Sequence, residues 1–234
     1  DGTPRSTFHH PSWSSQTCTL VGCLQDMKAA YRQVPRRESQ SHFFLVAYWD
    51  AEVGGPRIAE HFGQPFGASA AVNNFNRLAR AIRAVLVWLL WFPRTQYYDD
   101  YTVIEPGVVA ATSKRLFERA VAILGWNFEC KVSPSESFVS LGVQFNVGRV
   151  LSHGCLTICN TERRVANLVF ELNLIKKEGL LSPARAASLR GKLGFAFSQT
   201  FGKVGRAGLR PLTERQYSPG GTKTLTPQLR LSFE

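Results

Sequence analysis

Apolar residues follow two different periods along the chain, and the change from one to the other predicts a fold of class α+β. The apolar run 19–24 leads directly into Gln25 and Asp26, a pattern typical of a buried strand that ends on a carboxylate, although Gln25 is polar where an apolar residue would suit such a strand better. The aromatic and branched run 43–49 predicts a second strand. Residues 57–62 predict its return strand, because a Gly-Gly-Pro turn separates the two runs.

Residues 69–90 and 113–124 have the period of amphipathic helices. Pro93 ends the first helix, and Gly125 suits the left-handed cap of the second. The predicted apolar stripes consist of Val72, Phe75, Ala79, Ile82, Leu86 and Leu89 in the first helix and of Leu116, Phe117, Ala120, Ile123 and Leu124 in the second.

Beyond about residue 151 the pattern becomes helical. Thr161 suits the N-cap of a helix that Gly179 ends, and Ser182 with Pro183 opens another. We therefore predict a lead-in or truncated remnant over 1–18, a mixed α and β unit over 19–150, a helical region over 151–217 and a tail over 218–234.

Two adjacent carboxylates form the strongest chemical signal. Residues 96–98 and 101–104 are short strand-like arms around Asp99 and Asp100, which predicts a tight hairpin with both carboxylates at its tip. Like charges at this spacing favour a bound cation, and oxygen ligands select Mg²⁺ or Mn²⁺, with Asp26 as a third ligand of a site for two ions. The alternative is a solvated Asp-Asp turn.

The composition excludes several classes of protein and indicates the kind of partner. Hydrophobic residues make up 44% and charged residues 19% of the 234 residues, which excludes a disordered chain. The longest apolar run has nine residues, too few to cross a bilayer, and five cysteines fit a reducing compartment, so we expect an intracellular protein without a membrane partner. The net charge of +11 predicts a polyanionic partner, and 13 basic against 5 acidic residues beyond position 150 place most of this charge in the last third.

Five segments together resemble the palm of reverse transcriptases. Asp26, followed five residues later by Tyr31, resembles the first catalytic motif of this family, and residues 97–100 match its tyrosine-x-Asp-Asp motif. The remaining similar segments are residues 64–69 for the second motif, Leu124, Gly125, Trp126 and Lys131 for the fourth, and Leu141, Gly142 and Val143 for the primer grip. The resemblance implies a polymerase palm, a small antiparallel sheet backed by helices, over 19–150.

The resemblance also implies roles for single residues. Asp26, Asp99 and Asp100 would bind two Mg²⁺ or Mn²⁺ ions, and Lys131 would protonate the leaving pyrophosphate unless it is an ordinary exposed lysine. Tyr31 would exclude the 2′-hydroxyl of the incoming nucleotide; the alternative is a core tyrosine. Phe66 and Gly67 would line the floor beside the new base pair, and Tyr98 would contact the primer end.

The basic last third is similar to the segment that follows the palm in eukaryotic retroelements, particularly those mobilised by a tyrosine recombinase, which implies a thumb-like region. Its candidate phosphate contacts include Arg163, Arg164, Lys192, Lys203 and Arg206. Only 25 residues precede Asp26, too few for the fingers region of this family, so we expect a fragment of a larger polyprotein or a decayed copy.

The resulting hypothesis is an RNA-directed DNA polymerase that extends a primer on an RNA or DNA template with deoxynucleoside triphosphates. Two alternatives remain open. One is a catalytically silent nucleic-acid-binding remnant. The other is an RNA-directed RNA polymerase, against which Tyr31 argues, because such an enzyme needs a polar group that accepts the 2′-hydroxyl.

Overall fold

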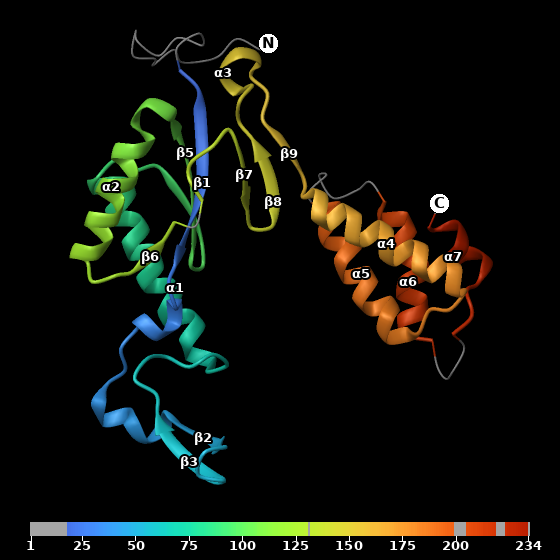
Figure 1. Cartoon of the computed structure of the whole chain (residues 1–234), viewed down its shortest axis with the longest axis horizontal. Coiled ribbons are helices and arrows are strands. Elements are labelled where there is room, and N and C mark those ends of the chain that lie inside the picture. Colours follow the sequence, from blue (N-terminus) through green and yellow to red (C-terminus); the bar gives the residue numbers. More distant parts are fainter. Residues whose placement is uncertain (1–17, 131, 199–204, 219–222, 234) are drawn as a thin grey trace. The chain divides into compact units, whose positions relative to one another are not determined.

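The chain folds into two compact units. The computed structural model describes residues 18–130, 132–198, 205–218 and 223–233. The sheet unit comprises the described residues up to Phe138 together with Val147–Cys155, and the helical unit comprises Val139–Asn146 and the described residues from Leu156 onward (Figure 1). Both units combine helices with antiparallel strands, so the α+β class is confirmed.

A four-stranded antiparallel sheet forms the centre of the sheet unit. Its order is β4–β5–β1–β6, with the bounds Arg94–Tyr97, Asp100–Pro106, Leu20–Met27 and Phe128–Glu129. The apolar run before Asp26 is confirmed as the central strand β1, which pairs with β5 from Leu20↔Pro106 to Asp26↔Asp100. The hairpin predicted around Asp99 and Asp100 is formed by β4 and β5, but of these two only Asp99 lies in the turn, because Asp100 already pairs with Tyr97 as the first residue of β5.

One face of this sheet is covered by helices α1 (Ser69–Ala84) and α2 (Gly107–Ile123), which lie on the same side of β1 and β5 (Figure 1). Alternate strand residues are buried, namely Cys23, Gln25 and Met27 of β1 and Tyr101, Val103 and Glu105 of β5. Met27 and Tyr101 join Phe75 of α1 and Phe117 of α2 in one hydrophobic core. Because side chains alternate along a strand, Asp26 and Asp100 lie on the opposite face.

The stripe predicted for the first helix is confirmed in its middle and wrong at both ends. Phe75, Ala79, Ile82 and Leu86 are buried, whereas Val72 is 39% exposed and Leu89 is 71% exposed. After Ala84 the helix continues as a π-helical turn, Val85–Leu89, ahead of Pro93. This wider turn changes the direction of the later side chains, which removes Leu89 from the buried stripe.

Helix α2 begins six residues earlier than the predicted Ser113. Pro106 precedes it in an extended conformation, and the Gly107 N–H donates to the Thr19 carbonyl rather than within the helix. The buried positions are Ala110, Ser113, Phe117 and Val121, whereas Leu116, Ile123 and Leu124 of the predicted stripe are exposed. The stripe was misassigned because several apolar residues outside it follow the same helical spacing.

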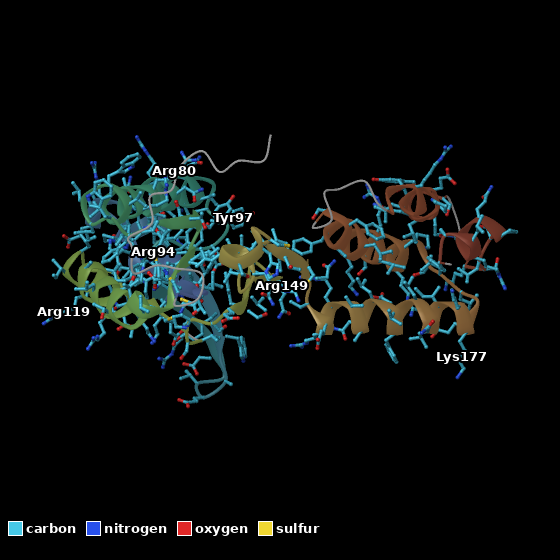
Figure 2. The ribbon with its side chains drawn as sticks, turned by 90° about the horizontal axis from the view of Figure 1, so that it is seen from above. Arg80, Arg94, Tyr97, Arg119, Arg149 and Lys177 are labelled. Carbon is cyan, nitrogen blue, oxygen red and sulfur yellow. The ribbon has the colours of Figure 1, made fainter. Side chains whose placement is uncertain are left out.

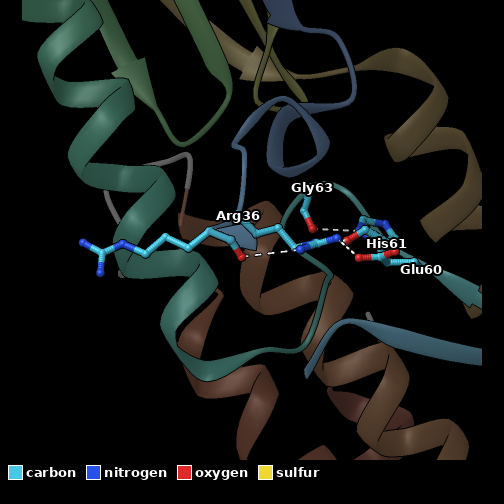
Figure 3. Close-up of polar contacts among 5 residues, drawn as sticks. Arg36, Glu60, His61 and Gly63 are labelled. Carbon is cyan, nitrogen blue, oxygen red and sulfur yellow. Dashed lines mark hydrogen bonds and ion pairs between the residues drawn. The ribbon is translucent and has the colours of Figure 1, made fainter. Parts of the chain in front are cut away.

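The predicted hairpin over 43–62 is confirmed as β2 (Leu45–Asp50) and β3 (Gly55–Glu60). Arg36 holds its base: the guanidinium forms an ion pair with Glu60 and donates to the His61 carbonyl at 3.1 Å, and the His61 ring contacts the Gly63 carbonyl (Figure 3). Gly63 needs to be glycine, because a Cβ there would lie 2.5 Å from the Arg32 carbonyl oxygen.

The helical unit contains β8 (Val143–Asn146), β9 (Thr157–Asn160), α4 (Glu162–Glu178), α5 (Pro183–Ser198), α6 (Leu209–Gln216) and α7 (Pro227–Leu231). Thr161 is confirmed as the N-cap of α4, since its side chain accepts from the Arg164 N–H, and Gly179 is the left-handed C-cap. The hydrophobic core of the helical unit includes Leu168, Ile175, Leu189 and Leu212.

The predicted division of the chain differs from the observed one in two places. Val139–Asn146 groups with the helical unit, because β8 pairs with β9, while α3 (Val150–His153) stays in the sheet unit. The described part of the predicted tail also folds: Leu225, Leu229 and Phe233 are buried in the core of the helical unit. Helix α7 has only 5 residues, too few for a helical period to be recognised in the sequence. Of the predicted lead-in, residues 1–17 lie outside the described residues.

Candidate active site

The end of the central sheet brings acidic residues from three strands into one row. Asp26 of β1 lies opposite Asp100 of β5 on one side and opposite Glu129 of β6 on the other. Directly opposed residues of antiparallel strands carry their side chains on the same face, with Cβ atoms about 5 Å apart. We call Asp100, Asp26 and Glu129 the carboxylate row; it lies on the face that α1 and α2 leave uncovered.

Asp99 lies in the turn beside this row. Tyr98 and Asp99 are the two residues between β4 and β5, and Tyr98 adopts a left-handed φ of 52°, as the first residue of a tight hairpin turn requires. The Met27 N–H donates to the Asp99 carbonyl at 3.0 Å, which fastens the turn to the end of β1. The structure therefore brings together the backbone of all three predicted metal ligands, Asp26, Asp99 and Asp100.

Carboxylate oxygens are the donors that Mg²⁺ prefers, and like charges opposed on one sheet face repel each other unless a cation neutralises them. The donor set therefore fits a divalent ion by its chemistry. Asp26, Asp99 and Asp100 are half-buried, while Glu129 is exposed. Among the described residues, no three His, Cys, Asp or Glu side chains form a group that could by itself hold a metal ion.

Tyr31 lies on an aromatic platform next to the acidic turn. Its ring centre is 4.8 Å from that of Phe66 and 4.7 Å from that of Phe75. Burial, followed by the charges of Asp99 and Tyr98, raises the pKa of the Tyr31 hydroxyl. The structure thus brings Tyr31, Phe66, Tyr98 and Asp99 to one region. Tyr31 is half-buried, so it is not a fully enclosed core tyrosine.

The surface beside Tyr31 is open. Phe66 is 75% exposed, and a Cβ added to Gly67 would meet nothing within 4 Å. Gly67 has a φ of +92°, a conformation that residues with a side chain rarely adopt, so the backbone rather than a close contact explains the glycine at this position. Gln64 joins this segment to the first motif, because its N–H donates to the Tyr31 carbonyl at 3.1 Å.

Two residues that support the site were not identified from the sequence. Gln33 donates to the Asn127 carbonyl and accepts from the Asn127 N–H, which fixes the 3₁₀ helix Ala30–Gln33 to the chain before β6. Arg94 donates from Nε to the Gln25 side chain at 2.9 Å, which explains the polar residue in β1. A signal for Arg94 was present in the sequence, because a buried Gln needs a polar partner.

Arg94 itself is buried among aromatic rings. Its guanidinium lies 4.6 Å from the Phe117 ring centre and 4.9 Å from that of Phe92. Burial lowers the pKa of Arg94, and Glu105 partly offsets this effect. Figure 2 shows Arg94 among the packed side chains, whereas Arg80 and Arg119 project from the surface. Arg94 therefore positions Gln25, the residue next to Asp26, and is not a surface contact for phosphate.

The predicted primer-grip residues belong to the helical unit. Leu141 and Gly142 form a tight turn with φ values of 51° and 73°, and Val143 is buried at the start of β8. The Gly142 carbonyl accepts from Arg164 at 2.6 Å. Leu141 is the one of the three whose side chain is exposed.

The predicted basic contacts fall into three groups. Arg163 is exposed, whereas Arg164 binds Gly142 and stacks on Phe195 at 4.3 Å, and Lys192 pairs with Glu171 at 2.8 Å. Arg163, Arg164, Lys192 and the exposed Phe170 line a groove of about 880 Å³ between α4 and α5. Lys203 and the side chain of Arg206 lie outside the described residues, as does Lys131, the residue predicted to protonate the leaving pyrophosphate.

The neighbours Arg163 and Arg164 are expected to respond differently to replacement by alanine. If Arg163 contacts phosphate, as the sequence predicts, Arg163→Ala should weaken duplex binding and lower the slope of log affinity against log salt by about one. Arg164→Ala should instead destabilise the helical unit by about 2 kcal/mol through lost internal hydrogen bonds. Anisotropy titrations at several KCl concentrations and thermal melts of both variants test this, and equal salt slopes in the wild type and Arg163→Ala would contradict it.

No protein-family model and no curated protein sequence matches this chain. None of the helices in the described part of the chain is both long enough and apolar enough to cross a membrane.

Proposed function

We propose that this chain is the palm and thumb-like part of an RNA-directed DNA polymerase that uses two divalent ions. The observation that carries the proposal is the register of β1 and β5, which sets Asp26 opposite Asp100, with Asp99 in the adjoining turn. Asp99 and Asp100 follow Asp26 by 73 and 74 positions in the chain. The resemblance of these motifs to reverse transcriptases was found from the sequence alone, without knowledge that the two strands pair.

In this function Asp26 and Asp99 would hold two Mg²⁺ or Mn²⁺ ions, and Asp100 would complete the acidic cluster. When bound, such ions would supply Lewis-acid activation of the primer 3′-hydroxyl and would neutralise the charge that develops on the leaving oxygen. Glu129 is not assigned a ligand role, because its side chain is exposed at the outer strand. The Met27 N–H keeps the Asp99 turn in place through its hydrogen bond to the backbone carbonyl.

The incoming deoxynucleotide binds against Tyr31, Phe66 and Gly67. The contact between the Tyr31 and Phe66 rings restricts the tyrosine, and the open space at Gly67 leaves room for a base pair. Tyr98 contacts the primer end from the hairpin turn. The groove lined by Arg163 and Lys192 supplies sequence-independent phosphate contacts in the helical unit.

Tyr31→Val is expected to admit ribonucleotides, because it removes the ring that would meet a 2′-hydroxyl. The ratio of kcat/KM for dCTP over CTP should fall by about tenfold or more, which corresponds to at least about 1.4 kcal/mol. Tyr31→Phe is the matched control, since it keeps the ring and should keep the selection. Unchanged sugar selection in Tyr31→Val would remove Tyr31 from this role.

Primer extension tests the function directly. The full chain is incubated with an RNA template, a DNA primer, the four deoxynucleotides and Mg²⁺ or Mn²⁺. Metal-dependent extension that stops on chelation is the expected result. Extension with ribonucleotides alone would favour an RNA-directed RNA polymerase.

A second candidate function is duplex binding without catalysis, which the basic groove between α4 and α5 would support without the carboxylates. Salt-sensitive binding with no extension under any metal condition would favour this candidate.

A further inference from the structure

Two cysteines face each other inside the sheet unit. Cys23 lies in β1 on the face covered by the helices, and Cys130 directly follows β6, the strand that pairs with the end of β1. Their sulfur atoms are 4.0 Å apart although the residues are 107 positions apart in the chain. Both are free thiols.

The two thiols differ in accessibility. Cys130 is half-buried and can be reached from solvent, whereas Cys23 is only 3% exposed. Burial, followed by the neighbouring Cys130 and Glu105, raises the pKa of the Cys23 thiol to about 12. A soluble oxidant therefore meets Cys130 first, and Cys23 remains a protonated thiol beside it.

We propose that Cys130 and Cys23 form a peroxide-responsive disulfide site, with Cys130 as the thiol that reacts first and Cys23 as the resolving thiol. The Cys130 thiolate attacks hydrogen peroxide: an S–O bond forms, the O–O bond breaks, and the leaving hydroxide takes up a proton as water. The Cys23 sulfur then attacks the Cys130 sulfenic acid: the S–S bond forms, the S–O bond breaks, and the hydroxide leaves with the Cys23 proton as a second water. Two thiols are oxidised to one disulfide while one peroxide is reduced to two waters.

The disulfide would act on the strand that carries Asp26. Bond formation brings the two sulfur atoms from 4.0 Å to about 2 Å, so the two side chains must rotate toward each other, and the bond then ties β1 to the chain after β6. Cys23 is three residues before Asp26. Cys130 follows Glu129, the residue of β6 that lies opposite Asp26. In this part the inference rests on the proposed polymerase function: oxidation should reduce primer extension.

The crosslink is measured without any need for activity. The full chain is treated with hydrogen peroxide, alkylated, and cleaved by trypsin without reduction. The expected product joins the peptides 6–28 and 120–131, which contain Cys23 and Cys130, and dithiothreitol should separate them. Cys130 found as sulfinic acid with no linked peptide would overturn the proposal.

Single variants identify the partners. Cys23→Ser and Cys130→Ser should abolish the linked peptide. Cys18→Ser is the sharpest control, because Cys18 shares the 6–28 peptide with Cys23, and it should leave the link intact. A link that persists in Cys23→Ser but is lost in Cys18→Ser would assign the wrong thiol and overturn the proposal.

Extension by the same samples tests the functional consequence. Peroxide should lower extension severalfold, dithiothreitol should restore it, and Cys130→Ser should resist the loss. Linked wild type that extends at the full rate would overturn the coupling to the site. If reduced protein never extends, the proposed function fails, while the peptide measurement still decides whether the disulfide forms.

Discussion

Asp99→Asn is expected to abolish primer extension, with a loss of at least about a thousandfold in kcat, while leaving duplex affinity within about twofold. The substitution removes one carboxylate charge from the site proposed for the metal ions. It keeps the shape of the side chain, and the hydrogen bond from the Met27 N–H is made by the backbone carbonyl and should persist. Extension kinetics and anisotropy binding on the same preparation measure both quantities.

Glu129→Gln is the matched control, because it removes a carboxylate from the same row at the exposed outer strand. It should cost less than about tenfold in kcat, in contrast to Asp99→Asn, since no ion depends on it in the proposed mechanism. Robust extension by Asp99→Asn would exclude the two-metal assignment. Equal losses in both variants would show that the whole row, rather than the motif residues, holds the ions.

Phe75→Ala is expected to lower the free energy of unfolding of the sheet unit by about 3–5 kcal/mol. Phe75 is fully buried in the core formed by α1, α2 and the sheet, and its ring contacts Tyr31. Trp49, Trp88, Trp91 and Trp126 lie in the described part of the sheet unit, and the helical unit contains no tryptophan, so tryptophan fluorescence in urea follows the unfolding of the sheet unit rather than of the helical unit.

Val72→Ala is the control for Phe75→Ala on the same helix. Val72 is partly exposed in the first turn of α1, and its truncation should cost less than about 1 kcal/mol. If Phe75→Ala does not fold, the milder Phe75→Leu should give an intermediate loss. Similar unfolding midpoints for Phe75→Leu, Val72→Ala and the wild type would contradict the packing of α1 against the sheet.

Local patterns in the sequence were sufficient to predict most of the helices and strands. The run before Asp26, the hairpin around Asp99 and the Thr161 cap were all predicted, because a strand, a tight turn and a helix cap each depend on a few consecutive residues. The ends of the α1 stripe and the start of α2 were not, since a π-helical turn and a contact from Gly107 to Thr19 override the simple period.

The site was predicted as residue types and only partly as an arrangement. Asp26, Tyr31 and Asp99 were selected from motif spacing, and the structure brings them to one end of the sheet unit. Arg94 and Gln33 were missed, because a supporting residue is defined by its partners, and Gln25 and Asn127 are 69 and 94 positions away from them. Arg164 was predicted to contact phosphate, but its guanidinium is held by Gly142 and Phe195 within the protein.

The sequence by itself determined the mixed α and β class, the hairpin with two carboxylates and the basic last third, because periodicity, turn chemistry and charge are properties of short segments. The tertiary structure alone decided which strands pair, and therefore that Asp26 lies opposite Asp100 and that Cys23 contacts Cys130. It also decided that Leu225, Leu229 and Phe233 complete the helical core rather than form a tail. These features depend on burying apolar surface and pairing backbone groups between distant segments, and the free energy of such contacts is not encoded in any one of those segments.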